Sequence, residues 1–152
     1  MDRESVFWKI ADGRLPPPPC AETLGIEFLR VTPESGSIEV KFEATSAFLN
    51  LAGNVQGGFL AAMLDDTMGP ALVATLGAGE FAPTVSLNVQ FHRPARVGAL
   101  KGIGRVLLRG KEVCQLSGEL LQDDRVVATG TATAVIRRMG TQTAWAAAQK
   151  PA

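Results

Sequence analysis

The segment from residue 57 to residue 76 is apolar on almost every side, and it restricts the possible folds more than any other part of the chain. A helix of this composition has to be covered on all its faces, because water solvates apolar side chains poorly. Its only charged residues are Asp65 and Asp66. Pro70 cannot donate a hydrogen bond to the carbonyl of Asp66, so a kink is expected there, and the residues "GAGE" at 77–80 are expected to end the helix.

Strand patterns lie on both sides of this helix in the sequence. Residues 37–43 alternate apolar and polar side chains with the period of a half-buried strand, and residues 84–92 do the same. Strands are expected at 24–31, 37–43, 84–92, 99–109, 112–121 and 126–136, with a loop at 44–56. Short turns between the last four strands predict an antiparallel meander. The predicted fold class is α+β, an antiparallel β-sheet of five to six strands wrapped around one long central helix. A second subunit, or the proline-rich residues 15–20, is expected to cover the rest of the helix.

The chain has 152 residues, which is the usual size of one domain. We expect an N-terminal helical segment at 1–14, with its helix at 2–11, followed by a single domain at 15–138. Residues 15–20, "LPPPPC", are expected to form an extended strap that leads into this domain. An alanine-rich tail at 139–152 completes the predicted organisation, and its composition suggests a fraying helix.

The net charge at pH 7 is zero. A neutral chain gives no indication of binding to nucleic acid or to an acidic membrane. No stretch reaches the roughly 18 apolar residues of a membrane span, and the N-terminus lacks the apolar core of a signal peptide. Cys20 and Cys114 have no metal-ligand spacing, so no metal site is expected, and free thiols are typical of a reducing compartment. The expected location is cytoplasmic.

Residues around the start of the central helix carry a family resemblance. They are Asn50, Gly53, the triplet Gln56-Gly57-Gly58 and Asp65, followed by "TVSLNVQFHRPARVG" at 84–98. Over residues 15–136 the pattern resembles the hotdog-fold acyl-CoA thioesterases, in the branch typified by the phenylacetic-acid-pathway thioesterase. The resemblance implies a hotdog fold and a homodimer, with dimers pairing into a dimer of dimers. It also implies hydrolysis of an acyl- or aryl-CoA thioester to a free acid and coenzyme A, which is part of the substrate, so that no separate cofactor is needed.

Hydrolysis of a thioester needs a donor for the developing oxyanion and a base or nucleophile. The resemblance assigns the donor to the N–H of Gly57, at a helix N-terminus, where unpaired N–H groups and the helix dipole favour negative charge. It assigns the base or nucleophile to Asp65. Eight residues of helix span roughly 12 Å, so one helix cannot present both groups to one carbonyl. Two antiparallel helices from two subunits can do so, with Gly57 of one subunit near Asp65 of the other.

Supporting roles are expected for neighbouring residues. Gly58 lets a substrate approach the backbone closely. The resemblance implies that Asn50 orients the water or the thioester and that the hydroxyl of Thr84 assists the base. Gln56 stands where the family has a histidine, and its amide can hydrogen-bond but cannot titrate near neutrality. Activity is expected to survive this change; the alternative is a catalytically silent protein that binds acyl-CoA.

Four basic residues, Arg93, Arg96, Lys101 and Arg105, lie close together in the sequence. In one interpretation they form a solvated face. In the other, Arg93 and Arg96 contact the phosphates of coenzyme A, because a guanidinium pairs well with phosphate.

Two further residues receive a structural interpretation. His92, the single histidine, is expected to be a surface or structural residue. Asp66 is expected to be a solvated acid of the helix face, or a packing residue beside the kink. A hydratase or dehydratase on the same fold is a further hypothesis, against which the absence of histidine between residues 50 and 70 argues.

Overall fold

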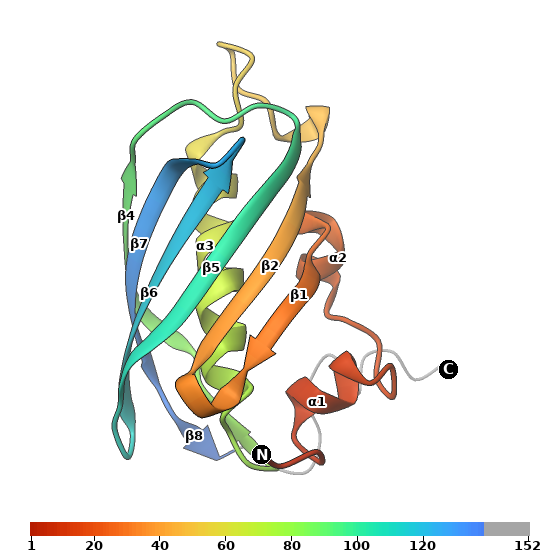
Figure 1. Cartoon of the computed structure of the whole chain (residues 1–152), viewed down its shortest axis with the longest axis vertical. Helices are drawn as coiled ribbons and strands as arrows, with labels where there is room; N and C mark the ends of the chain where they lie inside the picture. Colours follow the sequence, from red (N-terminus) through yellow and green to blue (C-terminus); the bar gives the residue numbers. More distant parts are fainter. Residues whose placement is uncertain (139–152) are drawn as a thin grey trace.

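The computed structural model describes residues 1–138, in which one long helix lies in the hollow of a curved, six-stranded antiparallel sheet (Figure 1). This arrangement confirms the fold class predicted from the sequence, while the predicted tail at 139–152 lies outside the described residues. The helices are α1 (Val6–Ala11), α2 (Pro19–Leu24) and α3 (Gly57–Val73), with short 3₁₀ turns at Pro33–Ser35 and Ser46–Phe48. The strands are β1 (Glu27–Thr32), β2 (Ser37–Ala44), β3 (Glu80–Phe81), β4 (Thr84–Phe91), β5 (Gly98–Arg109), β6 (Val113–Gln122), β7 (Arg125–Val135) and β8 (Arg137–Arg138).

The central helix α3 is buried against the sheet, as its apolar sequence requires. Met63, Leu64 and Met68 have no exposed surface. Two glycines of β5 allow the close approach: a Cβ at Gly104 would lie 2.6 Å from the carbonyl oxygen of Thr67, in the middle of the helix. The helix ends earlier than predicted, at Val73 rather than at residue 76.

The order of strands across the sheet is β1-β2-β5-β6-β7-β4. The predicted meander is therefore correct for β5, β6 and β7, but it is wrong for β4, which pairs with β7 at the edge and not with β5. The reason lies in the connection after β4, which crosses the end of the sheet to reach β5 (Figure 1). Hydrogen bonds hold it there, from the N–H of His92 to the carbonyl of Val127 and between the backbone of Arg96 and the side chain of Gln122.

The segment before β1 differs from the prediction. Residues 15–20 are not extended throughout, because α2 begins at Pro19; proline is well tolerated in the first turn of a helix. Gly25 ends α2 in the left-handed conformation, with φ of 63°, so the first strand begins at Glu27 and not at residue 24. The small pair formed by β3 and β8 was not predicted.

The first helix, α1, is shorter than the predicted 2–11 and is docked onto the end of α3. Phe7 and Trp8 are buried, and the indole Nε1–H of Trp8 donates a 3.1 Å hydrogen bond to the carbonyl of Ala74. The carboxylate of Asp2 accepts a 2.7 Å hydrogen bond from the N–H of Ala78. These contacts tie the start of the chain to the residues just after α3.

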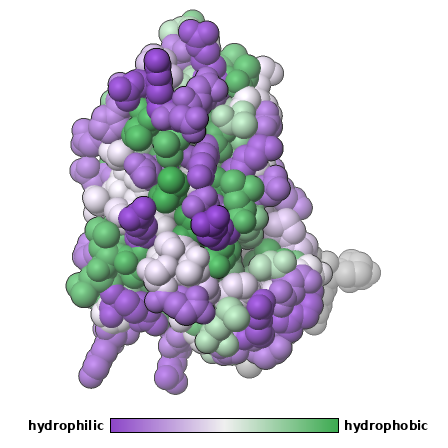
Figure 2. All heavy atoms as spheres, in the orientation of Figure 1, coloured by the Kyte–Doolittle hydropathy of each residue, from purple (hydrophilic) through white to green (hydrophobic). Residues whose placement is uncertain are grey.

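The edge strand β4 exposes much of its apolar side. Val85, Leu87 and Phe91 are 60%, 38% and 55% exposed, although the alternation of the sequence is that of a half-buried strand. Figure 2 shows other hydrophobic side chains reaching the surface among hydrophilic ones. An uncovered edge strand with apolar side chains is a site at which a second strand can add.

Candidate active site

The carboxylate of Asp65 is held by a hydroxyl at the start of β4. Thr84 Oγ1 donates a 2.7 Å hydrogen bond to Asp65 Oδ1, and both residues are partly buried. Asp65 lies in the middle of α3, and β4 runs beside the helix, so packing of the two elements brings the pair together. The structure thus places two predicted site residues in contact, and the hydrogen bond fixes the orientation of the carboxylate.

Gly57 lies at the first position of α3, beside the end of β4 that is opposite to Thr84. The first N–H groups of a helix have no partner within it, and Gln56, at the N-cap, makes no side-chain capping bond. The ring of Phe91, from the last position of β4, lies against Gly57: a Cβ at Gly57 would be 3.0 Å from Phe91 Cζ. A Cβ at Gly58 would meet nothing within 4 Å, so the backbone there is open to a ligand.

A pocket of about 390 Å³ opens beside Gly57. Asn50, Leu60, Phe91 and Arg93 are among the residues that line it. The pocket combines an apolar wall, a polar loop and a guanidinium at one helix N-terminus. Such a combination suits a ligand with an apolar part and an anionic part.

Asn50 shapes the loop beside this pocket. Its side-chain oxygen accepts hydrogen bonds from the N–H groups of Ala52 (2.9 Å) and Asn54 (3.2 Å). The oxygen is therefore used within the loop, and the side-chain amide group is the part of Asn50 that could serve a ligand.

Asp66 is a partly buried residue beside Asp65, and its position contradicts the prediction of a solvated helix-face acid. Its Oδ2 is buried and has no hydrogen-bond partner among the described residues. Burial, and then the neighbouring charge of Asp65, raise the pKa of Asp66 to about 6. The alternative of a packing residue near Pro70 agrees with this burial, because the low-dielectric surroundings disfavour the charged form.

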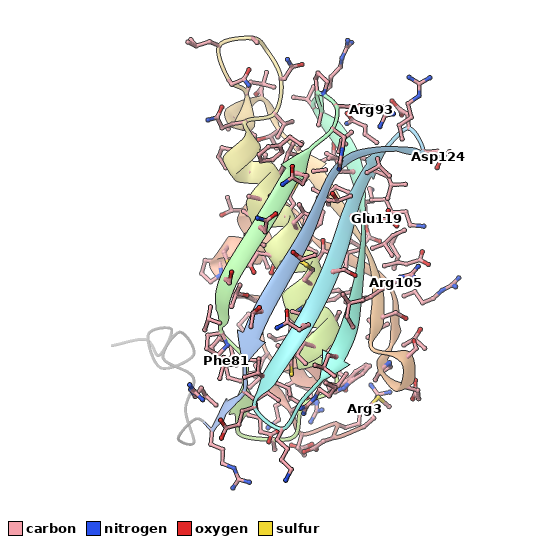
Figure 3. All side chains as sticks on the ribbon, turned by 90° about the vertical axis from the view of Figure 1, so that its left-hand side faces the viewer. Arg3, Phe81, Arg93, Arg105, Glu119 and Asp124 are labelled. Atoms are coloured by element: carbon pink, nitrogen blue, oxygen red, sulfur yellow. The ribbon has the colours of Figure 1, made fainter. Side chains whose placement is uncertain are left out.

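The four basic residues do not form one cluster. Arg93 lines the pocket, with Nη1 donating a 2.7 Å hydrogen bond to the carbonyl of Val126. Lys101 pairs with Glu39 at 2.9 Å on the sheet. Figure 3 shows Arg105 well below Arg93, along the sheet.

Arg96 and His92 lie on the connection after β4. Arg96 is exposed there, and its backbone is fixed by the side chain of Gln122. The His92 Nε2 lies 2.7 Å from the hydroxyl of Thr129, which gives the ring the structural contact expected of it.

Within one chain the two predicted reacting groups do not meet. Gly57 and Asp65 are separated by eight residues of continuous helix, roughly 12 Å. Each lies near a different end of β4, Asp65 with Thr84 and Gly57 with Phe91. One chain therefore keeps the two predicted groups apart.

Phe91 lines the pocket beside Gly57, and the sequence analysis did not name it as a candidate site residue. The alternation of β4 placed it on the apolar side of a strand, which is the usual position of a core residue. The signal that could have identified it is its place directly before "HRPARVG", where the strand leaves the sheet. Among residues 1–138 there is no group of three or more metal-ligating side chains, and no helix is long and apolar enough to cross a membrane.

The chain matches a family model and is similar to several solved structures. The family model of the thioesterase superfamily matches residues 52–129. A phenylacetic acid degradation-related protein from Ralstonia eutropha JMP134 is 46% identical, with a TM-score of 0.84 over 85% of this chain and 98% of that chain. AziG from S. sahachiroi is 26% identical, with a TM-score of 0.74 over 80% of this chain and 98% of that chain.

The PaaI protein of the E. coli phenylacetic acid degradation operon has a TM-score of 0.74 over 88% of this chain and 94% of that chain. Its sequence identity is 24%, so this likeness supports the fold alone. No curated protein sequence matches the chain.

Proposed function

The chain belongs to the thioesterase superfamily, and from that premise we propose that it hydrolyses an acyl- or aryl-CoA thioester to a free acid and coenzyme A. The observation that carries the proposal is the pair of half-sites at the two ends of β4. One half-site is a carboxylate held by a hydroxyl, and the other is a helix N-terminus that opens into a pocket.

The chemistry follows from these groups. The thioester carbonyl accepts a hydrogen bond from the N–H of Gly57. The carboxylate of Asp65, from the partner subunit, removes a proton from water as the oxygen of that water bonds to the carbonyl carbon. The carbonyl electron pair moves to oxygen, where the Gly57 N–H and the helix dipole stabilise it. Collapse of the intermediate breaks the C–S bond, and the departing thiolate takes up the proton. Direct attack by Asp65 as a nucleophile uses the same geometry.

Edge pairing of β4 would complete the site. Two copies of β4 paired antiparallel about the midpoint between Leu87 and Asn88 place Thr84 of one copy opposite Phe91 of the other. Because Thr84 holds Asp65 and Phe91 lies on Gly57, each Asp65 then lies near the opposing Gly57. The exposed apolar side chains of β4 support such an interface. A homodimer with two shared sites is therefore part of the proposal, and further pairing into a dimer of dimers remains compatible with it.

Two residues around the pocket have proposed substrate contacts. Arg93 lines the pocket and presents its guanidinium to the phosphates of coenzyme A, with Arg96 nearby on the same connection. Asn50 and Gln56 offer side-chain amides to the thioester or the water. Neither amide changes charge near neutrality, so the proton transfers fall to Asp65.

Mixed dimers test the proposal directly. Gly57→Pro removes the N–H at the first helical position, where proline is tolerated, and Asp65→Asn removes the base. Each variant alone is expected to lose thiol release from acyl-CoA. Co-expression of the two under different tags yields dimers of which half are mixed, each with one intact site, so about a quarter of the wild-type activity is expected.

Two results of this experiment would contradict the proposal. An absence of recovered activity in purified mixed dimers would overturn the sharing of sites between subunits. A wild-type protein that binds acyl-CoA but releases no thiol from any aryl or fatty acyl-CoA would establish the catalytically silent binder instead.

A further inference from the structure

The ring of Phe91 stands at the helix N-terminus where the thioester carbonyl is proposed to bind. In the sheet Phe91 pairs with the fully buried Ala128, so its side chain lies on the helix side of β4. The outer end of the ring reaches Gly57, with Cζ, Cε2 and Cε1 lying 3.0, 3.3 and 3.4 Å from the position of a Cβ there. Phe91 is nevertheless 55% exposed and lines the pocket.

We propose that Phe91 determines which acyl groups the site accepts, by limiting the width of the group at the carbon next to the thioester carbonyl. Acyl groups with an unbranched α-carbon, such as arylacetyl or straight-chain groups, fit beside the ring, and α-branched groups collide with it. The inference rests on the proposed function and names the substrate class of the same site.

The position of the ring supports a contact with the α-carbon. A carbonyl oxygen bound to the N–H of Gly57 places the carbonyl carbon within a few ångströms of that residue, and the α-carbon is one bond further. The ring already occupies the space that a side chain at Gly57 would need. A substituent on the α-carbon that points toward β4 would therefore meet the ring.

The chemistry of the ring favours the acyl side of the thioester over the pantetheine side. Pantetheine carries amide groups that need hydrogen-bond partners, and a phenyl ring supplies none. Leu87 lies four residues earlier on the same side of β4 and is 38% exposed, so the apolar wall continues along the strand away from the pocket. Arg93 offers positive charge on the connection that follows Phe91, where the anionic end of the substrate is proposed to lie.

A matched pair of inhibitors tests this inference without requiring turnover. The probes are two coenzyme A ketones in which a methylene replaces the thioester sulfur, one with a phenylacetyl group and one with a 2-phenylpropionyl group, which adds a single α-methyl. Calorimetry on the wild-type protein is expected to show about tenfold tighter binding of the unbranched ketone, since one methyl group changes the affinity of an apolar site by about this factor. In Phe91→Ala the preference is expected to disappear through a gain in affinity for the branched ketone.

Two further variants keep the test sharp. Phe91→Leu retains an apolar side chain in case Phe91→Ala fails to fold, and it is expected to reduce the preference. Leu29→Ala is the control for loss of an exposed apolar side chain: Leu29 is 51% exposed and lies on β1, at the opposite edge of the sheet from β4, so the preference should remain.

Several outcomes would overturn the inference. It is wrong if folded Phe91 variants keep the tenfold preference, or if they weaken both ketones and free coenzyme A equally, which would place the ring against pantetheine. Absence of ketone binding in the wild type would also overturn it. Selective binding without thiol release from the corresponding thioesters would leave this inference intact and overturn the proposed hydrolysis.

Discussion

The hydroxyl of Thr84 donates a 2.7 Å hydrogen bond to the carboxylate of Asp65, joining the first residue of the edge strand to the middle of the central helix. The bond engages Oδ1, one of the two carboxylate oxygens. A partly buried carboxylate that is oriented in this way suits a general base better than a freely rotating one. The relationship also couples the position of the base to the strand at which two subunits are proposed to pair.

Replacing Asp65 by asparagine is expected to lower kcat for thioester hydrolysis by at least about a hundredfold, because the amide cannot accept the proton. The near-identical volume should preserve folding, which circular dichroism and thermal unfolding would check. Thiol release from a panel of aryl- and fatty acyl-CoAs gives the rate. Retention of more than a tenth of the wild-type kcat would rule out Asp65 as the base.

Loss of the Thr84 hydroxyl is expected to reduce kcat by about tenfold or more while leaving KM nearly unchanged, since the hydroxyl positions the carboxylate rather than the substrate. Thr84→Val removes the bond with little change in shape, and Thr84→Ser is expected to restore most of the rate. Thr131→Val, on the exposed side of β7, is the control. A change confined to KM would indicate that Thr84 contacts the substrate instead.

Asp66 is expected to make the stability of the protein depend on pH. Its pKa is raised from 3.8 in the unfolded chain to about 6 in the fold. The folded state therefore binds the proton more tightly, and this contribution is fully present below pH 3.8 and lost as pH rises to about 6. Asp66→Asn should match the wild type near pH 3.5 and exceed its free energy of unfolding by up to about 3 kcal/mol above pH 7.

Denaturant unfolding between pH 3.5 and pH 8 checks the Asp66 prediction. The exposed residue Glu34 provides the matched control, since Glu34→Gln removes a carboxylate that has no recorded partner among the described residues. Equal pH dependence in the Asp66→Asn and wild-type proteins would show that the fold does not raise the pKa of Asp66.

Gln56→His is expected to preserve or increase the hydrolysis rate. Gln56 is exposed at the N-cap of α3 and makes no capping bond, so the fold does not depend on its amide. An imidazole at this position can still donate a hydrogen bond to a thioester. Steady-state kinetics would measure the effect, and a loss of more than about tenfold in kcat/KM would show that the glutamine amide is matched to the substrate.

Two glycine substitutions should have opposite effects on stability. Gly104→Ala places a Cβ 2.6 Å from the backbone oxygen of Thr67, and the helix has to move away, at a cost of about 1–3 kcal/mol. Gly69→Ala meets nothing within 4 Å and lies inside α3, so it should stabilise the fold by about 0.5–1 kcal/mol. Chemical denaturation measures both, and equal midpoints for the two variants would contradict the packing described between α3 and β5.

The sequence predicted those parts of the molecule that depend on local pattern. The apolar segment after Gly57 could only be a covered helix, and alternation identified the strands of the sheet. The pairing of β4 with β7 could not be predicted from alternation, because the order of strands along the chain does not show which strands are neighbours in the sheet. The helix that begins at Pro19 was not predicted, because a run of prolines usually excludes a helix. Pro19 is the last proline of the run and occupies the first helical position, where proline is tolerated.

The candidate site shows the same division. Spacing and resemblance predicted Gly57, Asp65 and Thr84, and the structure brings the last two into contact. The burial of Asp66 depends on how α3 packs, which one-dimensional periodicity did not resolve because the helix is apolar on nearly every side. The contact of Phe91 with Gly57 joins residues far apart in the sequence, and only the three-dimensional arrangement shows it.

The docking of Trp8 onto Ala74 gives the protein an internal optical reporter. An indole that is buried and hydrogen-bonded emits at a shorter wavelength than one in water, so detachment of α1 should shift the emission to the red even while the sheet stays intact. Comparison of wild-type emission with that of Trp8→Phe isolates this signal from the second tryptophan of the chain. Fluorescence could then follow release of the N-terminal segment separately from global unfolding.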